Sequence, residues 1–319
     1  MNFLNIKQNV YYLVGKSLFS LRNFKIHRQI LRNGFFLKKS YFEGITIYFY
    51  TNFQNTPHGN KKNLVLLHGF LDSSFTFRKI LTYLKDDYNL FILDIPGHGN
   101  TKVPYIRELW QISTLTRAMY RFLFEYLQIP KPIFLTHSMG GFLVFHMLSY
   151  AKKRGDFPKN FNCILFAIAP GMLQFQKDLR ERNQRMFFPS TIQDIDNLLK
   201  NLFPKNLKEI PLFVKYFLLK EWNHLGLQYL IKNTLENEEE VFYTEKTLQK
   251  NPFPKETILI WGDKDTIVPM EYSKKLLKII KPSKLIIIPE TGHTPHIEEP
   301  ELFYKKIRKD LERINQIRF

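Results

Sequence analysis

The feature that most constrains the fold is a series of six short apolar runs, which alternate with longer amphipathic stretches. Each run is almost continuously apolar, as is typical of strands buried on both faces of a parallel sheet. The stretches between them have helical periodicity, near residues 73–85, 106–128, 139–154, 270–281 and 297–316. This alternation predicts an α/β fold, a mostly parallel sheet with helices on both faces. The runs read NLVLLHG, NLFILDIPG, PIFLTHS, NCILFAIAP, TILIWGD and KLIIIPE.

Two further segments complete the predicted architecture. The segment FFLKKSYFEGITIYFYTNF predicts two strands joined by a hairpin turn at Glu43-Gly44. Between the apolar runs near 163–169 and 257–261 lie roughly 80 residues, too many for a simple crossover. Ser190 and Gln193 form a candidate capping box for an amphipathic helix there. We therefore expect an inserted helical cap over 173–255, between a first core part at 34–172 and a second at 256–319.

The N-terminal segment, residues 1–33, is expected to be a basic amphipathic helix. It contains no acidic residue, and the first one in the chain is Glu43. Polar residues interrupt it too often for it to span a bilayer. Such a helix can lie in a membrane interface or pack on its own domain, and the sequence leaves both readings open. The apolar residues that share one predicted face are Phe3, Ile6, Val10, Leu13, Val14, Leu18 and Leu21.

Net charge and cysteine content exclude several classes of function for this chain. The net charge is +18, but no nucleic-acid-binding motif accompanies it, so we expect no nucleic-acid partner. Lysines on solvated faces account for most of this charge. The single cysteine, Cys163, excludes an intrachain disulfide and a cysteine-based metal cage. We expect no cofactor, no metal site and a cytoplasmic location, with peripheral membrane contact through residues 1–33 as an option.

Chemically suggestive residues follow four of the predicted strands. In an open α/β sheet, reactive groups belong on the loops at the carboxyl ends of the strands. Taken together, these segments offer a nucleophile, an acid and a base in that chain order. They are His68-Gly69-Phe70-Leu71, His137-Ser138-Met139-Gly140-Gly141, Gly262-Asp263-Lys264-Asp265 and Thr291-Gly292-His293-Thr294-Pro295-His296.

These motifs make the chain resemble the α/β-hydrolase superfamily over about residues 34–319. Within it, the chain is most similar to serine esterases and lipases of the monoacylglycerol-lipase type. The resemblance implies an eight-stranded, mostly parallel sheet with a cap inserted where that family places its lid. It also implies acyl transfer, because relatives that cleave carbon–halogen bonds or epoxides have Asp at the position of Ser138. The motifs that carry it are LVLLHGF, LDIPGHGNT, THSMGG, LIWGDKDTIVP and TGHTPHIEEP.

The resemblance implies a role for each site residue. Ser138 is the nucleophile, His293 the general base and Asp265 the carboxylate that orients the base. Asp265 is preferred to Asp263 by the family's Gly-x-x-Asp pattern, and His293 is preferred to His296. The backbone N–H groups of Phe70 and Met139 are expected to form the oxyanion hole. Asp94 and His98 are expected to support the floor of the site, and His68 to orient the oxyanion loop.

One residue departs from the family pattern. The usual nucleophile motif is Gly-x-Ser-x-Gly, whereas this chain has Thr136 two residues before Ser138. A β-branched residue suits the end of a strand, and Gly140 and Gly141 remain on the helix side. We therefore expect the turn around Ser138 to form and the reaction type to be unchanged.

The leading hypothesis is hydrolysis of carboxylic esters of lipid-like substrates, such as monoacylglycerols or short and medium acyl esters, through an acyl-enzyme. A second hypothesis is carbon–carbon hydrolysis or a menaquinone-pathway-type lyase step on the same triad, with Arg180, Arg182 and Arg185 of the cap binding an anionic substrate. A third hypothesis is that the chain is a small-molecule receptor, which keeps the triad and turns over its ligand slowly. A cap cavity lined by apolar side chains would favour the first over the second.

Overall fold

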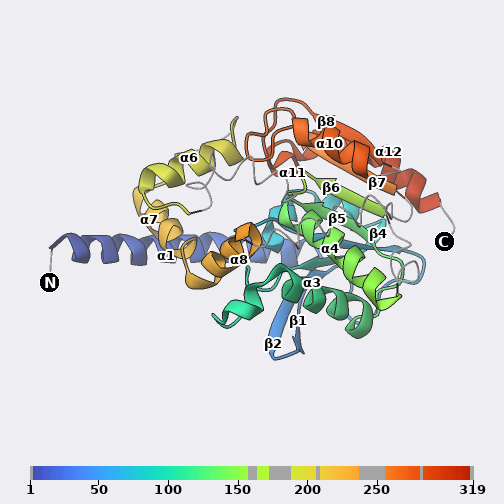
Figure 1. Cartoon of the computed structure of the whole chain (residues 1–319), viewed down its shortest axis with the longest axis horizontal. Helices are drawn as coiled ribbons and strands as arrows, with labels where there is room; N and C mark the ends of the chain where they lie inside the picture. Colours follow the sequence, from blue (N-terminus) through green and yellow to red (C-terminus); the bar gives the residue numbers. More distant parts are fainter. Residues whose placement is uncertain are drawn as a thin grey trace.

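One eight-stranded sheet forms the centre of the molecule (Figure 1). The computed structural model describes residues 3–156, 164–171, 188–205, 209–236, 256–280 and 283–316. The strand order is β1-β2-β4-β3-β5-β6-β7-β8. β2 pairs antiparallel with β1 and β4, and the other neighbouring pairs are parallel. The predicted α/β fold with a mostly parallel sheet is confirmed. The strands are β1 (Phe36–Phe42), β2 (Ile45–Thr51), β3 (Lys62–Leu67), β4 (Tyr88–Leu93), β5 (Ile133–His137), β6 (Ile164–Ile168), β7 (Glu256–Gly262) and β8 (Ser283–Ile288).

The helices between the strands follow the predicted periodicity. The stretch expected near 73–85 is a 3-10 helix followed by a single α-helical turn, and that near 106–128 is α3 between a 3-10 helix and a π-helical turn. The helices are α1 (Phe3–Arg32), η1 (Ser74–Lys79), α2 (Leu81–Leu84), η2 (Arg107–Trp110), α3 (Ile112–Arg121), η3 (Phe122–Tyr126), α4 (Met139–Arg154), α6 (Ile192–Leu202), α7 (Leu212–Glu221), α8 (Leu225–Glu236), α10 (Glu271–Ile279), α11 (Pro295–Glu298) and α12 (Pro300–Gln316).

The predicted hairpin joins β1 and β2. Phe42 pairs with Ile45, and the two residues between them are Glu43 and Gly44. Both have positive φ values, 49° and 83°. A two-residue loop with this conformation matches the right-handed twist of the flanking strands, which is why Gly is favoured there. The hairpin is therefore formed at the position that the sequence predicts.

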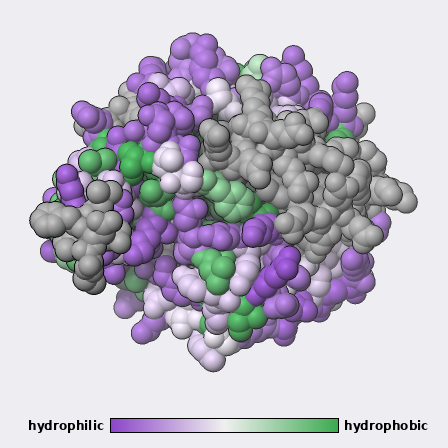
Figure 2. All heavy atoms as spheres, turned by 60° about the vertical axis from the view of Figure 1, so that its left-hand side comes forward, coloured by the Kyte–Doolittle hydropathy of each residue, from purple (hydrophilic) through white to green (hydrophobic). Residues whose placement is uncertain are grey.

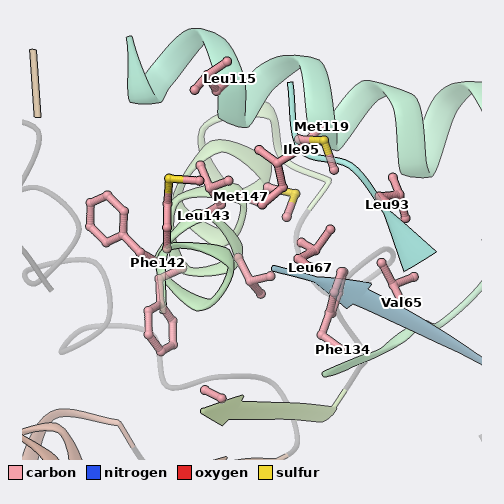
Figure 3. Packing of buried hydrophobic residues seen from close by; sticks show 14 of the residues in the cluster. Val65, Leu67, Leu93, Ile95, Leu115, Met119, Phe134, Phe142, Leu143 and Met147 are labelled. Atoms are coloured by element: carbon pink, nitrogen blue, oxygen red, sulfur yellow. The ribbon is translucent and has the colours of Figure 1, made fainter. Parts of the chain in front are cut away.

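Helices cover both faces of the sheet, and apolar side chains fill each interface. On one face, Val65 and Leu67 of β3 pack in a cluster with residues of α3, α4 and α10. Figure 3 shows part of this cluster, with Leu115 and Met119 of α3 above the strands. On the other face, the alternate residues of the same strands pack against η1, α2, α12 and the C-terminal part of α1. The continuous apolar runs thus reflect burial on both sides.

Three helices occupy the described part of the predicted cap, α6, α7 and α8 (Figure 1). The expected capping box is one residue further along the chain than predicted. Thr191 is the N-cap of α6, and its hydroxyl accepts the N–H of Asp194 at 3.1 Å. The Asp194 carboxylate in turn accepts the N–H of Thr191 at 2.9 Å. Gln193 therefore has no capping role, because the helix begins one residue later than the predicted box requires. Arg180, Arg182, Arg185 and Cys163 lie outside the described residues.

The N-terminal helix α1 packs against the cap helix α7 (Figure 1). The rings of Phe19 and Phe217 lie 5.0 Å apart, and the Tyr12 hydroxyl donates to Glu221 at 3.0 Å. The helices approach so closely at Gly15 that a Cβ there would lie 2.0 Å from the carbonyl oxygen of Phe213. Further along α1, Ile26 and Ile30 join the core beneath the sheet. One face of α1 is therefore an integral part of the domain.

The opposite face of α1 remains in solvent, and from Val10 to Leu21 it is the apolar face that the sequence predicts. Leu13 is 59% exposed and Leu21 is 49% exposed. Phe24 continues the same exposed stripe. Among the residues that the structure describes, no helix is long and apolar enough to cross a membrane. The exposed large apolar residues of α1 are Val10, Leu13, Val14, Leu18, Leu21, Phe24 and Leu31.

Candidate active site

Ser138 lies in a sharp turn between β5 and α4. Its φ and ψ angles, 47° and −113°, fall outside the regions that non-glycine residues ordinarily adopt. Such strain costs on the order of 1–3 kcal/mol and is found mainly at functional sites. The turn is held by its backbone, because the Ser138 N–H donates to the Ile168 carbonyl at 2.8 Å and the Gly141 N–H donates to the Ser138 carbonyl at 3.0 Å. The serine is thereby held at the carboxyl end of the sheet and the N-terminus of α4.

Two glycines allow α4 to begin this close to the sheet. A Cβ at Gly140 would lie 2.3 Å from the Leu67 carbonyl oxygen of β3. A Cβ at Gly141 would lie 2.8 Å from the Cβ of Pro170. Neither position has space for a side chain unless the backbone moves. The tight strand-to-helix turn expected from the sequence is therefore present.

The unusual Thr136 fits into this turn without disrupting it. Its side chain is fully buried, and its hydroxyl donates to the Phe166 carbonyl of β6 at 3.3 Å. In the sheet it lies opposite Ala167, which is small. A Cβ added at Gly141 would lie 3.1 Å from the Thr136 Oγ1 atom. The missing side chain of Gly141 therefore leaves room for the threonine side chain.

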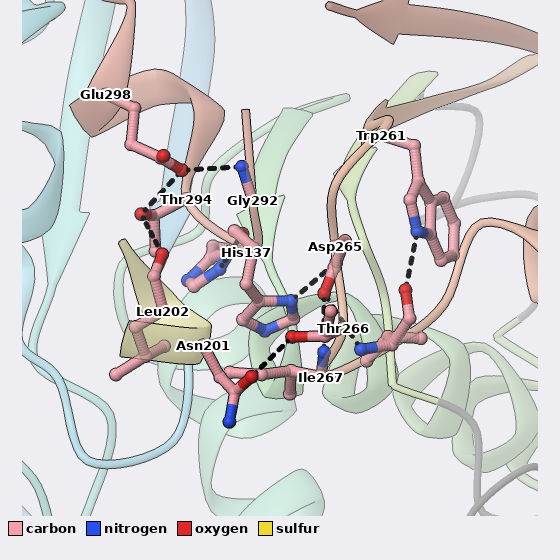
Figure 4. Close-up of polar contacts among 12 residues, drawn as sticks. His137, Asn201, Leu202, Trp261, Asp265, Thr266, Ile267, Gly292, Thr294 and Glu298 are labelled. Carbon is pink, nitrogen blue, oxygen red and sulfur yellow. Dashed lines mark hydrogen bonds and ion pairs between the residues drawn. The ribbon is translucent and has the colours of Figure 1, made fainter. Parts of the chain in front are cut away.

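The structure brings His293 and Asp265 together, as the sequence predicts. The His293 Nδ1 atom lies 2.8 Å from the Asp265 Oδ2 atom, and both side chains are buried. The other Asp265 oxygen accepts the N–H groups of Ile267 and Val268, each at 2.9 Å (Figure 4). These donors fix the carboxylate, which can then hold Nδ1 in its protonated form and leave Nε2 to accept a proton. The alternative base, His296, instead contacts the Thr76 hydroxyl at 3.0 Å.

Two positioning residues were not recognised from the sequence. The His137 Nε2 atom lies 3.0 Å from the His293 carbonyl oxygen, which ties the residue before Ser138 to the loop that carries His293. Glu298 accepts the Gly292 N–H at 2.9 Å and holds the other end of that loop (Figure 4). Burial raises the pKa of Glu298 and lowers the pKa of His137 well below its ordinary value. Both residues belong to motifs quoted above, but their roles depend on contacts between distant parts of the chain.

The predicted oxyanion loop lies beside Ser138. Phe70 lines the same cavity as Ser138 and His293. Met139 is the first residue of α4, a position whose N–H has no partner within its helix. His68 braces this loop, because its Nε2 accepts the Ile95 N–H at 3.0 Å and its Nδ1 lies 2.7 Å from the Gly69 carbonyl oxygen. This is the orienting role expected for it.

Asp94 and His98 do not line the Ser138 cavity. The two Asp94 oxygens accept the N–H groups of Ser74 and Asn100, each at 2.8 Å. His98 is buried, and burial together with the charge of His68 lowers its pKa to about 3. Their contacts are those of residues that brace loops, as expected.

The cavity in front of Ser138 has a volume of about 640 Å³, within the usual range for small-molecule sites. Phe70, Ser138 and His293 are among the residues that line it. Residues of the described cap also line it, and all of these but Glu209 are apolar. These apolar cap residues are Leu198, Leu199, Leu202, Phe203, Ile210, Pro211, Val214, Leu218 and Trp222.

Comparison with known proteins agrees with this geometry. The family model described as the alpha/beta hydrolase fold matches residues 62–300, and the chain belongs to that family. The chain is 27% identical to YugF, a hydrolase of Bacillus subtilis, over 83% of this chain and 94% of YugF. It is 23% identical to the monoacylglycerol lipase ABHD6 of Mus musculus, over 80% of this chain and 77% of ABHD6.

The fold also resembles solved structures along almost its whole length. One is the crystal structure of a bacterial membrane phospholipase A, with a TM-score of 0.75 and 17% sequence identity. The superposition covers 98% of this chain and 96% of that one. At this identity the likeness concerns the fold, and it includes the part of the chain that carries α1.

Proposed function

We propose that this protein is a serine hydrolase that cleaves carboxylic esters of lipid-like substrates through an acyl-enzyme intermediate. The observation that carries the proposal is the position of Ser138. It lies in a strained turn, in one cavity with His293, and His293 is held by Asp265. Membership of the alpha/beta hydrolase family supports the same reaction class.

The proposed reaction uses each group at a definite atom. The Ser138 Oγ atom attacks the ester carbonyl carbon while the His293 Nε2 atom accepts its proton. Asp265 stabilises the charged imidazole, and the N–H groups of Phe70 and Met139 stabilise the negative oxygen of the tetrahedral intermediate. The carbon–oxygen bond then breaks, and the leaving alcohol takes the proton from His293. A water molecule, activated in the same way, releases the acid and restores the serine.

The wall of the cavity supports an acyl chain as part of the substrate. Apolar side chains of α6 and α7 line the cavity that Ser138 also lines, and an acyl chain would bury its methylene groups against them at about 0.8 kcal/mol each. An arginine-lined cap would instead favour carbon–carbon cleavage or the lyase step. The described cap residues that line this cavity are apolar apart from Glu209, which supports the ester hypothesis. Arg180, Arg182 and Arg185, which the alternative requires, lie outside the described residues.

The first test is hydrolysis of a graded series of acyl esters and monoacylglycerols by the full chain and by its Ser138→Ala variant. We expect Ser138→Ala to lower kcat by about 10⁴-fold or more, because the nucleophile is lost. Ser149→Ala is the matched control, since this buried serine of α4 lies outside the cavity and its hydroxyl meets only the Phe145 carbonyl. Folded protein that hydrolyses none of these esters would contradict the proposal and direct attention to carbon–carbon cleavage or to a receptor role.

We further propose that α1 contacts an anionic membrane surface with its exposed face. The exposed apolar residues lie on a helix whose charged residues are all basic, so anionic lipids match it in both hydrophobicity and charge. On the face turned forward in Figure 2, hydrophobic groups form small patches among hydrophilic ones. This pattern fits a shallow, peripheral contact. The opposite face of α1 is already occupied by α7 and the core, so both roles expected for this segment can coexist.

A further inference from the structure

A second cavity, of about 1010 Å³, adjoins the Ser138 cavity, and the two share several lining residues. Among these shared residues are Phe19 and Arg22 of α1, Arg78 of η1, and Trp222 after α7. The junction therefore lies between the N-terminal helix, the cap and the loop that follows β3. Because the two cavities adjoin here, the junction offers space for the other end of a substrate whose acyl chain lies under the cap.

The two arginines at the junction have no carboxylate partner at ion-pair distance among the residues that the structure describes. The Arg22 Nη1 atom donates to Asn23 at 3.2 Å, and the Arg78 Nη1 atom donates to the Phe75 carbonyl at 3.0 Å. A guanidinium has five N–H donors, so these bonds leave most of them for a ligand. Other arginines of the domain, such as Arg154 and Arg313, instead pair with carboxylates.

The surroundings make this a concave cationic site. Solvent reaches Arg22 and part of Arg78, yet protein surrounds them enough for burial to lower the pKa of both. Both arginines line both cavities, and the charge of Arg22 contributes to lowering the pKa of Arg78. Asp72 also lines the junction, and its Oδ1 atom accepts the Ser73 N–H at 2.8 Å. Among the described residues that line both cavities, two cations against one carboxylate leave a net positive charge.

We propose that Arg22 and Arg78 form an anion subsite that binds the phosphate group of a phosphorylated acyl ester, so that the substrates are of the lysophospholipid class. This inference rests on the proposed ester hydrolysis and names the substrate class of that site. Guanidinium groups bind phosphate oxygens through pairs of charged hydrogen bonds, and two arginines from different elements can grip one phosphate from two directions. The acyl chain then lies on the apolar cap wall and the phosphate at the junction.

The test compares two substrates with the same acyl chain, a monoacylglycerol and its glycerol phosphate counterpart, in neutral detergent micelles. Arg22→Gln and Arg78→Gln are each expected to lower kcat/KM for the phosphorylated substrate by about 10- to 100-fold, because a hydrogen bond to a charged group is lost. The neutral substrate should change by about twofold or less. Arg28→Gln is the matched control, because Arg28 also lies on α1 but lines neither cavity. Equal losses on both substrates, or none on either, would overturn the subsite.

A binding measurement separates failure of the subsite from failure of the proposed reaction. Ser138→Ala protein should bind the phosphorylated lipid more tightly than the neutral one, and the preference should disappear when Arg22→Gln is added. Competition experiments with glycerol 3-phosphate and with inorganic phosphate distinguish a headgroup site from a site for free phosphate. Competition by glycerol 3-phosphate supports a headgroup site, whereas competition by inorganic phosphate alone would overturn the lipid assignment. If the wild-type chain hydrolyses no ester, this preference still decides the subsite, and its absence would refute it.

Discussion

Thr136 and Gly141 lie against each other next to the turn that carries Ser138. The threonine hydroxyl bonds to the neighbouring strand, and the glycine lies against both it and Pro170. The usual Gly-x-Ser-x-Gly pattern has a glycine at the strand position that Thr136 occupies. Here the larger residue, Thr136, lies on the strand side of the turn, and the residues on the helix side, Gly140 and Gly141, are both small.

Gly141→Ala should therefore destabilise the protein by about 1–3 kcal/mol, because the added methyl group overpacks a filled region. Thr136→Ala, which vacates part of that space, should reduce this cost when the two changes are combined. Urea unfolding of the two single variants and the double variant gives the coupling energy, expected to be at least about 0.5 kcal/mol. Strictly additive losses would show that the two positions do not compete for space.

At the scale of elements, α1 has two apolar faces with different surroundings. Tyr12, Gly15 and Phe19 face α7, whereas Leu21 and Phe24 face solvent. Truncation of residues 1–30 would remove Ile26 and Ile30 from the core and destabilise the domain. A loss of membrane binding by the truncated chain could then result from unfolding. Substitutions on the exposed face avoid this difficulty.

The double variant Leu21→Gln, Phe24→Gln should bind vesicles of phosphatidylglycerol and phosphatidylcholine at least about tenfold more weakly than the wild type. Half-exposed Leu and Phe side chains still have apolar area to bury, at about 25 cal/mol per Å². Vesicle flotation measures the partition, with Leu225→Gln as the control, since Leu225 is 44% exposed on α8. Equal flotation of all three proteins would refute the membrane contact.

The sequence predicted the secondary-structure elements better than the contacts between residues of different elements. Continuous apolar runs predicted the buried strands, and the motifs after them predicted the meeting of His293 with Asp265. The capping box of α6 was misplaced by one residue, because Ser190 and Thr191 are both good N-caps and the pattern alone does not separate them. The bond from His137 to the His293 carbonyl joins residues 156 positions apart, which no local pattern can indicate.

At the scale of the whole molecule, buried histidines make stability depend on pH. Burial lowers the pKa of His146 and His296 from 6.5 to about 3, and lowers that of His137 well below 6.5. In the unfolded chain these side chains take up protons near pH 6.5. Between these pH values the unfolded state therefore binds more protons than the folded state.

The free energy of unfolding should consequently fall as the pH decreases from about 6.5 toward 3, by up to about 1.4 kcal/mol per pH unit for each such histidine. His296→Gln can keep a hydrogen bond to Thr76. It should reduce the number of protons taken up on unfolding by about one, and so reduce the slope of the unfolding free energy against pH. Urea unfolding of both proteins from pH 7 to pH 5 measures the slopes. A wild-type slope of zero, or identical slopes, would contradict the prediction.

The last turn of α6 is hydrogen-bonded to the loops that carry Asp265 and His293. The hydroxyl of Thr266, next to Asp265, donates to Asn201, and that of Thr294, next to His293, donates to the Leu202 carbonyl (Figure 4). Lifting this helix breaks both bonds, at about 0.5–1.5 kcal/mol each. The position of α6 is therefore coupled to the positions of the Asp265 and His293 loops. By linkage, a ligand that stabilises the contact between Asp265 and His293 also stabilises the observed position of α6, with the same coupling free energy.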